Sequence, residues 1–267
     1  MAADRSTGTD VVLGAGSGMG EAVARRLAAD SGRLLLADID AAAVERVAGE
    51  LGGRIEVLRC DLTDPADLQA LADATGDLGR LVLTAGLSPT MAPGRRIFEV
   101  DIIGPARLVQ AFEPLAGEGS VAVLLASMAG HMFPAMEEVD RILDDPLAPS
   151  VLDDLVGAGL DVDEPGMAYG ISKRALMRLV RRRAPAWGAQ GARIVSVSPG
   201  IIDTPMGRKE FEQQPVMADL VAGSPLGRMI DADEIAAVVE FLLSPAASAV
   251  TGTDVLVDGG AVAQLMG

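Results

Sequence analysis

The chain has 267 residues, 49% of them hydrophobic, and a formal net charge of −16. Its length and apolar content are sufficient for one large core. The negative charge argues against nucleic acid or an anionic membrane surface as a partner, because no basic face is available to neutralise phosphates.

Cysteine and histidine are too rare for two common kinds of site. With only Cys60 and His131, an intramolecular disulfide is impossible and a His/Cys metal site is not expected. No N-terminal stretch has the basic, apolar and small-residue order of a signal peptide, and no apolar run approaches the ~20 residues that cross a membrane. We therefore expect a soluble, cytoplasmic protein without a metal, with Cys60 in its core.

Short apolar runs alternate with helix-like segments along the chain. Strands are predicted at 9–13, 33–38, 55–60, 80–84, 121–126, 193–198 and 254–257. Helices are predicted at 19–30, 41–51, 65–74, 96–113, 167–187 and 232–243, with Asp64 and Asp231 as N-caps. Continuous apolar strands separated by helices are typical of a parallel sheet buried on both faces. The sequence therefore predicts a doubly wound, Rossmann-like α/β fold in a single domain, 1–267.

Two stretches interrupt this alternation. Residues 131–165 carry ten acids and one base, and they are too long for a plain loop. We interpret them as an insertion with one or two short helices between the fifth strand and the following helix. Residues 206–226 carry scattered apolar side chains and are predicted to form a mobile lid. Residues 87–95 and 131–134 are further candidate walls of a substrate pocket.

A glycine-rich loop follows the first strand and opens the first helix. Gly14 suits a tight turn, while Gly18 and Gly20 let the backbone approach a pyrophosphate and the helix pack closely on the sheet. The helix N-terminus offers free N–H groups to phosphates. The alternative is a turn that merely uses glycine, but this setting predicts a dinucleotide site.

Asp38 ends the second predicted strand, 24 residues after Gly14. A carboxylate there can accept hydrogen bonds from the adenosine ribose hydroxyls and would repel a 2′-phosphate. No Arg or Lys occupies positions 15–17 or 39–40, where a 2′-phosphate would need a cation. The sequence therefore predicts NAD(H) rather than NADP(H). The alternative, that Asp38 caps the next helix, stays open.

Tyr169 and Lys173 stand four positions apart in a predicted helix, so both side chains project to one face. A free phenol has a pKa of about 10, and a nearby cation should lower that pKa. Such a tyrosine could exchange a proton near neutral pH. The alternative is that Tyr169, the only tyrosine of the chain, is a packed helix residue and Lys173 a solvated one.

Several motifs in order resemble the short-chain dehydrogenase/reductase family, in its single-domain branch. The resemblance covers nearly the whole chain. Its motifs are Gly14-x-x-x-Gly18-x-Gly20, Asp61-Leu62, Thr84-Ala85-Gly86, Ser127, Tyr169 with Lys173, Pro199-Gly200-Ile201-Ile202-Asp203-Thr204 and Asp258-Gly259-Gly260. The residues expected at the cofactor are Gly14, Ser17, Gly18, Met19, Gly20, Asp38, Ile39, Asp61, Leu62, Ala85, Gly86, Tyr169, Lys173, Pro199, Ile202 and Thr204.

The resemblance implies hydride transfer between nicotinamide and a small hydrophobic ketone or secondary alcohol. Tyr169 would give or take the proton at the substrate oxygen, and Ser127 would donate a hydrogen bond to that oxygen. Lys173 would lower the pKa of Tyr169 and bind the nicotinamide ribose. The alternative is that Ser127 hydrogen-bonds only to the backbone at the end of a strand.

This chain departs from the family pattern at two places. Asp101 aligns with the asparagine that shapes a proton path to the lysine, so the relay is in doubt and Asp101 could also be a plain surface residue. The second departure is the gap between Ser127 and Tyr169, which is 169 − 127 = 42 residues against about a dozen in most relatives. The combination of this insertion with Ala184-Pro185-Ala186-Trp187-Gly188 and Ser244-Pro245-Ala246-Ala247-Ser248 is most similar to bacterial 3α-hydroxysteroid dehydrogenase/carbonyl reductases. This resemblance makes a hydroxysteroid a candidate substrate.

Other functions remain open at this point. One is a carbonyl reductase or alcohol dehydrogenase for non-steroid substrates, and another is a non-catalytic NAD-sensing protein. His131 could touch the substrate or support the site from outside. The family often forms tetramers through the helices that carry Asp101 and Tyr169. Because the insertion could cover that surface, we expect a homodimer involving residues 258–266, with a tetramer as the alternative.

Overall fold

The structure is a computed structural model, and it describes residues 8–266. Its strands are β1 (Thr9–Leu13), β2 (Leu34–Asp38), β3 (Ile55–Arg59), β4 (Leu78–Leu83), β5 (Val121–Leu125), β6 (Arg193–Pro199), β7 (Ile202–Asp203), β8 (Ile230–Asp231) and β9 (Asp254–Val257). Its α-helices are α1 (Gly18–Ala28), α2 (Ala41–Glu50), α3 (Pro65–Thr75), α4 (Gly94–Phe98), α5 (Gly104–Phe112), α6 (Ala129–Met132), α7 (Glu137–Ile142), α8 (Val151–Gly157), α9 (Pro165–Ala189), α10 (Pro205–Gln213), α11 (Pro215–Gly223), α12 (Ala232–Leu243) and α13 (Ala261–Met266). Short 3₁₀ turns follow α5 at Glu113–Leu115 and α12 at Pro245–Ala247.

The main sheet has seven parallel strands in the order β3-β2-β1-β4-β5-β6-β9. The order reverses between β1 and β4, so the connections leaving these strands diverge and open a crevice at their carboxyl ends. The predicted strands are confirmed within about two residues at each end. The predicted N-caps are also confirmed, because Asp64 accepts from Ala66 N and Asp231 forms a capping box with Glu234.

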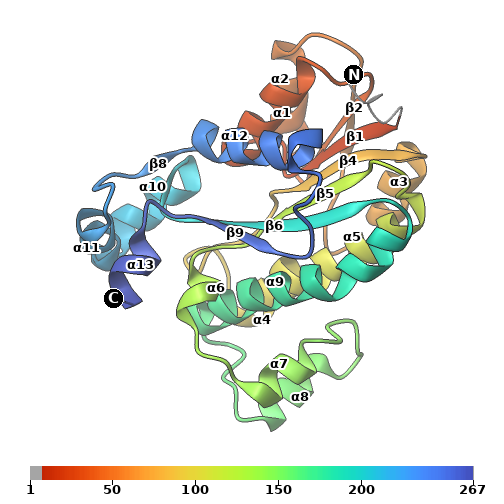
Figure 1. Ribbon diagram of the computed structural model, residues 1–267. Helices are drawn as coiled ribbons and strands as arrows, with labels where there is room; N and C mark the ends of the chain where they lie inside the picture. Colours follow the sequence, from red (N-terminus) through yellow and green to blue (C-terminus); the bar gives the residue numbers. More distant parts are fainter. Residues whose placement is uncertain (1–7, 267) are drawn as a thin grey trace.

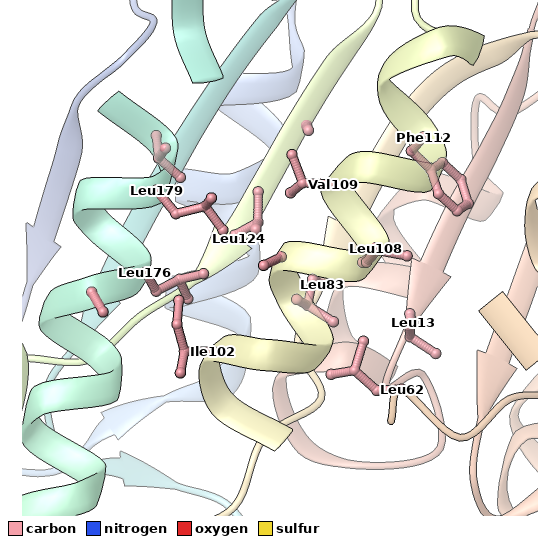
Figure 2. Packing of buried hydrophobic residues seen from close by; sticks show 14 of the residues in the cluster. Leu13, Leu62, Leu83, Ile102, Leu108, Val109, Phe112, Leu124, Leu176 and Leu179 are labelled. Atoms are coloured by element: carbon pink, nitrogen blue, oxygen red, sulfur yellow. The ribbon is translucent and has the colours of Figure 1, made fainter. Parts of the chain in front are cut away.

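Helices cover both faces of the sheet (Figure 1). One face packs against α1, α2 and α12, and the other against α3, α5 and α9. Figure 2 shows the second of these cores, where leucines from β1, β4 and β5 meet α5 and α9. Strands β1 and β5 are buried along their full length, which explains why they are continuous apolar runs in the sequence. Cys60 lies in this core, as predicted.

The predicted helix over 96–113 is present but is not uniform. It begins as α4, widens into a π-helix at Glu99–Ile103, and continues as α5. Helical periodicity alone cannot reveal the π-turn, because the apolar pattern continues across it. The turn includes Asp101, which is buried, and π-bulges are frequent at functional sites.

The insertion at 131–165 holds the end of α6 and the two short helices α7 and α8, which confirms the predicted helical content. In Figure 1, α7 and α8 lie outside α9, on the side away from the sheet. Arg174 of α9 makes a two-pronged ion pair with Asp140, at 3.0 and 2.7 Å, and Arg178 binds Asp144 at 2.7 Å. Part of the acidity of the insertion therefore holds it against α9.

The region at 206–226 forms helices α10 and α11, which the sequence analysis described only as a lid. Within residues 8–266, none of the helices combines the length and apolar character needed to cross a membrane. The single domain over 1–267 stays a prediction, and residues 1–7 and 267 lie outside the described part of the chain.

A substitution at Gly20 would show how closely α1 must approach the sheet. A Cβ on Gly20 would lie 1.9 Å from the Gly14 carbonyl oxygen, so Gly20→Ala forces backbone to move. We expect Gly20→Ala to lower the free energy of unfolding by at least about 2 kcal/mol in a denaturant titration. Gly49→Ala is the control, because that position in α2 has nothing within 4 Å and should gain up to about 1 kcal/mol. Equal stability of the two variants would contradict the close packing.

Candidate active site

The glycine-rich loop and the ends of β2, β3 and β4 line a cleft of about 320 Å³ at the reversal of strand order. Gly14 has φ +96°, and a Cβ there would lie 2.4 Å from Ala85 N, so a larger residue would break the contact with β4. Gly18 has φ +54° and begins α1, whose first N–H groups are not capped by the Ser17 side chain. The loop therefore offers bare backbone donors at a helix N-terminus, which fits a pyrophosphate.

Asp38 lines the same cleft, and two backbone donors fix its side chain. Its Oδ2 accepts from Gly16 N at 2.9 Å and its Oδ1 from Asp40 N at 3.0 Å. The cap of α2 is Asp40, which accepts from Ala43 N, so the alternative role for Asp38 as that cap is wrong. The nearby Arg46 donates to Gly16 O but is engaged by Glu21 at 2.8 Å and Glu50 at 3.2 Å.

A second cavity, of about 330 Å³, holds the predicted Ser127 and Tyr169. Met19, Thr204 and Met206 line both this cavity and the cleft, so the two spaces adjoin. Ser127 donates a hydrogen bond to the Tyr169 hydroxyl and itself accepts from Ala129 N at 3.2 Å. A serine and a tyrosine hydroxyl therefore converge on one point of an otherwise mostly apolar chamber.

Lys173 lies behind Tyr169 and lines neither space. Its Nζ is 5.5 Å from the centre of the Tyr169 ring and 3.3 Å from Asp101 Oδ2, and it donates to the Leu125 carbonyl oxygen at 3.5 Å. Asp101 Oδ1 accepts from Leu87 N at 2.8 Å. Both charged side chains are buried, so Asp101 is not a plain surface residue, and the two form an ion pair in the interior.

The predicted lowering of the pKa of Tyr169 is wrong for this structure. Burial raises the pKa of the Tyr169 phenol, the hydrogen bond from Ser127 acts against that rise, and the charges of Asp101 and Glu210 add to it. Lys173 does not dominate, because its ammonium is paired with Asp101. Burial also raises the pKa of the Asp101 carboxyl, with Lys173 and Leu87 N acting against the rise.

Most of the residues predicted to bind the cofactor line the cleft or the cavity. The cleft is lined by Gly14, Ser17, Gly18, Met19, Gly20, Asp38, Ile39, Asp61, Leu62, Ala85, Gly86 and Thr204. The cavity is lined by Met19, Ser127, Tyr169, Pro199, Ile202 and Thr204. The Thr204 hydroxyl caps α10 by accepting from Gly207 N at 3.0 Å, and its hydrogen is free to donate into either space.

The lid supplies pocket residues that the sequence analysis did not single out. Met206 and Glu210 of α10 line the cavity, one helical turn apart on the same face. Thr204 is a predicted cofactor residue, and a helix that begins at Pro205 brings Met206 and Glu210 to one face beside it. This helical spacing is the signal that could have identified Glu210. Of the other candidate walls, Pro89 and Met132 line the cavity. His131 does not line it, because its Nε2 is bound to Asp254 Oδ2 at 2.8 Å.

Comparison with known proteins shows which family the chain resembles. A family model described as enoyl-(acyl carrier protein) reductase matches residues 14–140 and 154–262. A short-chain dehydrogenase/reductase, bsc3 of Alternaria brassicicola, is 34% identical over 97% of each chain. Galactitol 2-dehydrogenase of Cereibacter sphaeroides is 33% identical, over 93% of this chain and 92% of that protein.

The resemblance to hydroxysteroid dehydrogenases is also present in the comparisons. The 3α-hydroxysteroid dehydrogenase/carbonyl reductase of Comamonas testosteroni is 32% identical, over 94% of this chain and 95% of that protein. A solved 7α-hydroxysteroid dehydrogenase, in complex with NADH and a 7-oxo bile acid, superposes with a TM-score of 0.74 at 28% identity and covers 95% of this chain and 93% of its own. With a Rossmann-like sheet, a glycine-lined cleft and a Ser127–Tyr169 pair beside it, the chain belongs to the short-chain dehydrogenase/reductase family of oxidoreductases that act on CH–OH groups.

Proposed function

We propose that this chain is an NAD(H)-dependent dehydrogenase/reductase for a compact hydrophobic ketone or secondary alcohol, acting in the cytoplasm. One observation carries the proposal: the hydroxyls of Ser127 and Tyr169 meet in an apolar cavity that shares Met19 and Thr204 with the dinucleotide cleft. A substrate oxygen bound at these hydroxyls would place its carbon toward that boundary. Bound nicotinamide supplies or accepts the hydride there.

The side chains divide the remaining work. In carbonyl reduction, Tyr169 gives its hydroxyl proton to the substrate oxygen while Ser127 donates a hydrogen bond that stabilises the developing charge. In alcohol oxidation the proton returns from the substrate to Tyr169. Lys173 and Asp101 lie behind the phenol, so a proton leaving Tyr169 would pass toward this buried pair.

Support for NAD(H) comes from Asp38. Its carboxylate lines the cleft and is fixed by two backbone donors, which orients it to accept from ribose hydroxyls. A 2′-phosphate would meet this charge, while Arg46 is already held by two acids.

Support for the substrate class comes from the cavity. Met128, Met132, Met206, Val216, Met217 and Leu220 form apolar walls, and methionines adapt to varied shapes. Its volume of about 330 Å³ is near the lower end for small-molecule sites, which favours a compact ring compound. A hydroxysteroid is the second candidate, supported by the similarity to the Comamonas testosteroni enzyme. It would need α10 and α11 to open, and that mobility stays a prediction. A non-catalytic NAD sensor is disfavoured, because Ser127 and Tyr169 are both present in the cavity that adjoins the cleft.

The first experiment is a screen of NADH absorbance against cyclic alcohols, aryl ketones and hydroxysteroids, with both nicotinamide cofactors. We expect turnover with at least one compact cyclic compound and a preference for NAD(H) of at least about tenfold in kcat/KM, because Asp38 repels a 2′-phosphate. A preference for NADP(H) would overturn the cofactor assignment. Tyr169→Phe is the control and should reduce kcat by orders of magnitude while NADH binding is retained.

The raised pKa of Tyr169 can be followed by its own absorbance. Tyr169 is the only tyrosine, so phenolate absorbance during an alkaline titration follows this residue alone. We expect ionisation above the ordinary pKa in the wild type, and at a lower pH in Asp101→Asn, because a negative charge is removed. The pH at which alcohol oxidation rises should fall in parallel, since oxidation needs the ionised phenol.

Two controls keep that result interpretable. Glu138→Gln removes an exposed charge of the insertion and should leave the titration unchanged. Circular dichroism checks folding, because Asp101→Asn leaves Lys173 buried without a counter-charge and should lower stability by about 3 kcal/mol. A folded Asp101→Asn protein whose phenol titrates as in the wild type would contradict the role of the ion pair.

We also propose a homodimer that does not use the outer face of α9, since Asp140 of α7 and Asp144 after it are bound to that face through Arg174 and Arg178. The exposed Leu265 and Met266 of α13 make the C-terminal segment the proposed contact. Light scattering should give the mass of two chains, and Leu265→Glu should reduce it to one. A tetramer would contradict this arrangement.

A further inference from the structure

Glu210 is the acid of the substrate cavity. It lies on α10 and faces the same chamber as Ser127 and Tyr169. Among the described side chains that line the chamber, none is cationic and no other is acidic. Glu210 is half-buried, and its charge is close enough to act on the Tyr169 phenol.

The described contacts leave the Glu210 carboxyl with unused capacity. Its hydrogen-bond partner is Ser88, a fully buried residue of the loop after β4. A carboxyl group has two oxygens with about four lone-pair sites, so one hydroxyl partner does not saturate it. A ligand that replaces water at this half-buried carboxyl must supply a donor in its place, because a polar group that loses water without a new partner is costly.

The position of Glu210 also limits the charge of a ligand. An anionic group brought beside a half-buried carboxylate would be repelled, and no cation of the described chamber walls compensates for that repulsion. A neutral hydroxyl or an ammonium would instead be attracted. Both protonation states of Glu210 keep an acceptor oxygen, so preference for a donor does not require ionisation.

We propose that Glu210 is a specificity-determining residue that selects substrates with a second hydrogen-bond donor beyond the reacting carbon and rejects substrates with a carboxylate there. This inference rests on the proposed function, because it names the substrate class of the same cavity. A neutral cyclic diol or hydroxyketone is the compact compound that satisfies both the apolar walls and Glu210. An amino alcohol supplies the same donor chemistry with a charge.

Four alcohols that share one ring separate these chemistries: cyclohexanol, cyclohexane-1,4-diol, 4-aminocyclohexanol and 4-hydroxycyclohexanecarboxylate. We measure kcat/KM for each with NAD⁺ and compare ratios to cyclohexanol, so that a general loss of activity cancels. The wild type should favour the diol and disfavour the carboxylate. Glu210→Gln should raise kcat/KM for the carboxylate, relative to cyclohexanol, about tenfold. Glu210→Leu should lower kcat/KM for the diol, relative to cyclohexanol, about tenfold. If Glu210→Gln lowers only kcat/KM for 4-aminocyclohexanol relative to cyclohexanol, the donor that Glu210 selects is a cation.

Glu212→Gln is the matched control, because it removes the same charge from an exposed position of the same helix.

A second experiment measures ligand binding and does not need turnover. The shift in unfolding temperature caused by cyclohexanecarboxamide should exceed that caused by cyclohexanecarboxylate, and Glu210→Gln should abolish the difference. Unchanged ratios and shifts in the Glu210 variants would overturn this inference. Absence of turnover with every alcohol, with the binding preference intact, would instead count against the proposed dehydrogenase activity.

Discussion

The buried ion pair between Lys173 and Asp101 is the interaction on which the proposed chemistry of this protein depends. Two full charges in a protein interior are tolerated when they neutralise each other, and here Asp101 Oδ2 has the ion pair with Lys173 but no hydrogen-bond partner among the described residues. Lys173 is held by Asp101 and the Leu125 carbonyl, and Asp101 by Leu87 N. The π-turn at Glu99–Ile103 carries Asp101, and Gly86 leaves room beside it, since a Cβ there would lie 3.1 Å from Lys173 Nζ.

This pairing changes what Tyr169 could do in the proposed reaction. A lone ammonium behind the phenol would favour phenolate, but a paired one contributes much less field. Tyr169 lies between two carboxyl groups, Asp101 from the core side and Glu210 from the lid side, and both act to keep it protonated. A neutral phenol is the form that donates a proton to a substrate oxygen. The surroundings of Tyr169 therefore favour its protonated form, which is the form that the proposed carbonyl reduction needs.

The sequence was sufficient to predict those features whose cause is local. Strands buried on both faces appear as apolar runs, and the caps at Asp64 and Asp231 follow from side chains next to their own helices. Features that depend on distant partners were missed. The sign of the Tyr169 shift depends on burial of the phenol and on the charges of Asp101 and Glu210, which come from distant parts of the chain. The position of His131 depends on Asp254 in the last strand of the sheet.

Glu210 shows why a lid is the hardest part of such a site to predict. In the run Arg208-Lys209-Glu210 it resembles any solvated helix residue, and only the placement of α10 puts it in the wall of the cavity. Helix α9 shows the opposite case. Its inner face carries Tyr169 and Lys173, while its outer face is held by the insertion through Arg174 and Arg178. A helix held on both faces keeps the geometry of Tyr169 and Lys173, so we expect differences in specificity to arise at α10 and α11 instead.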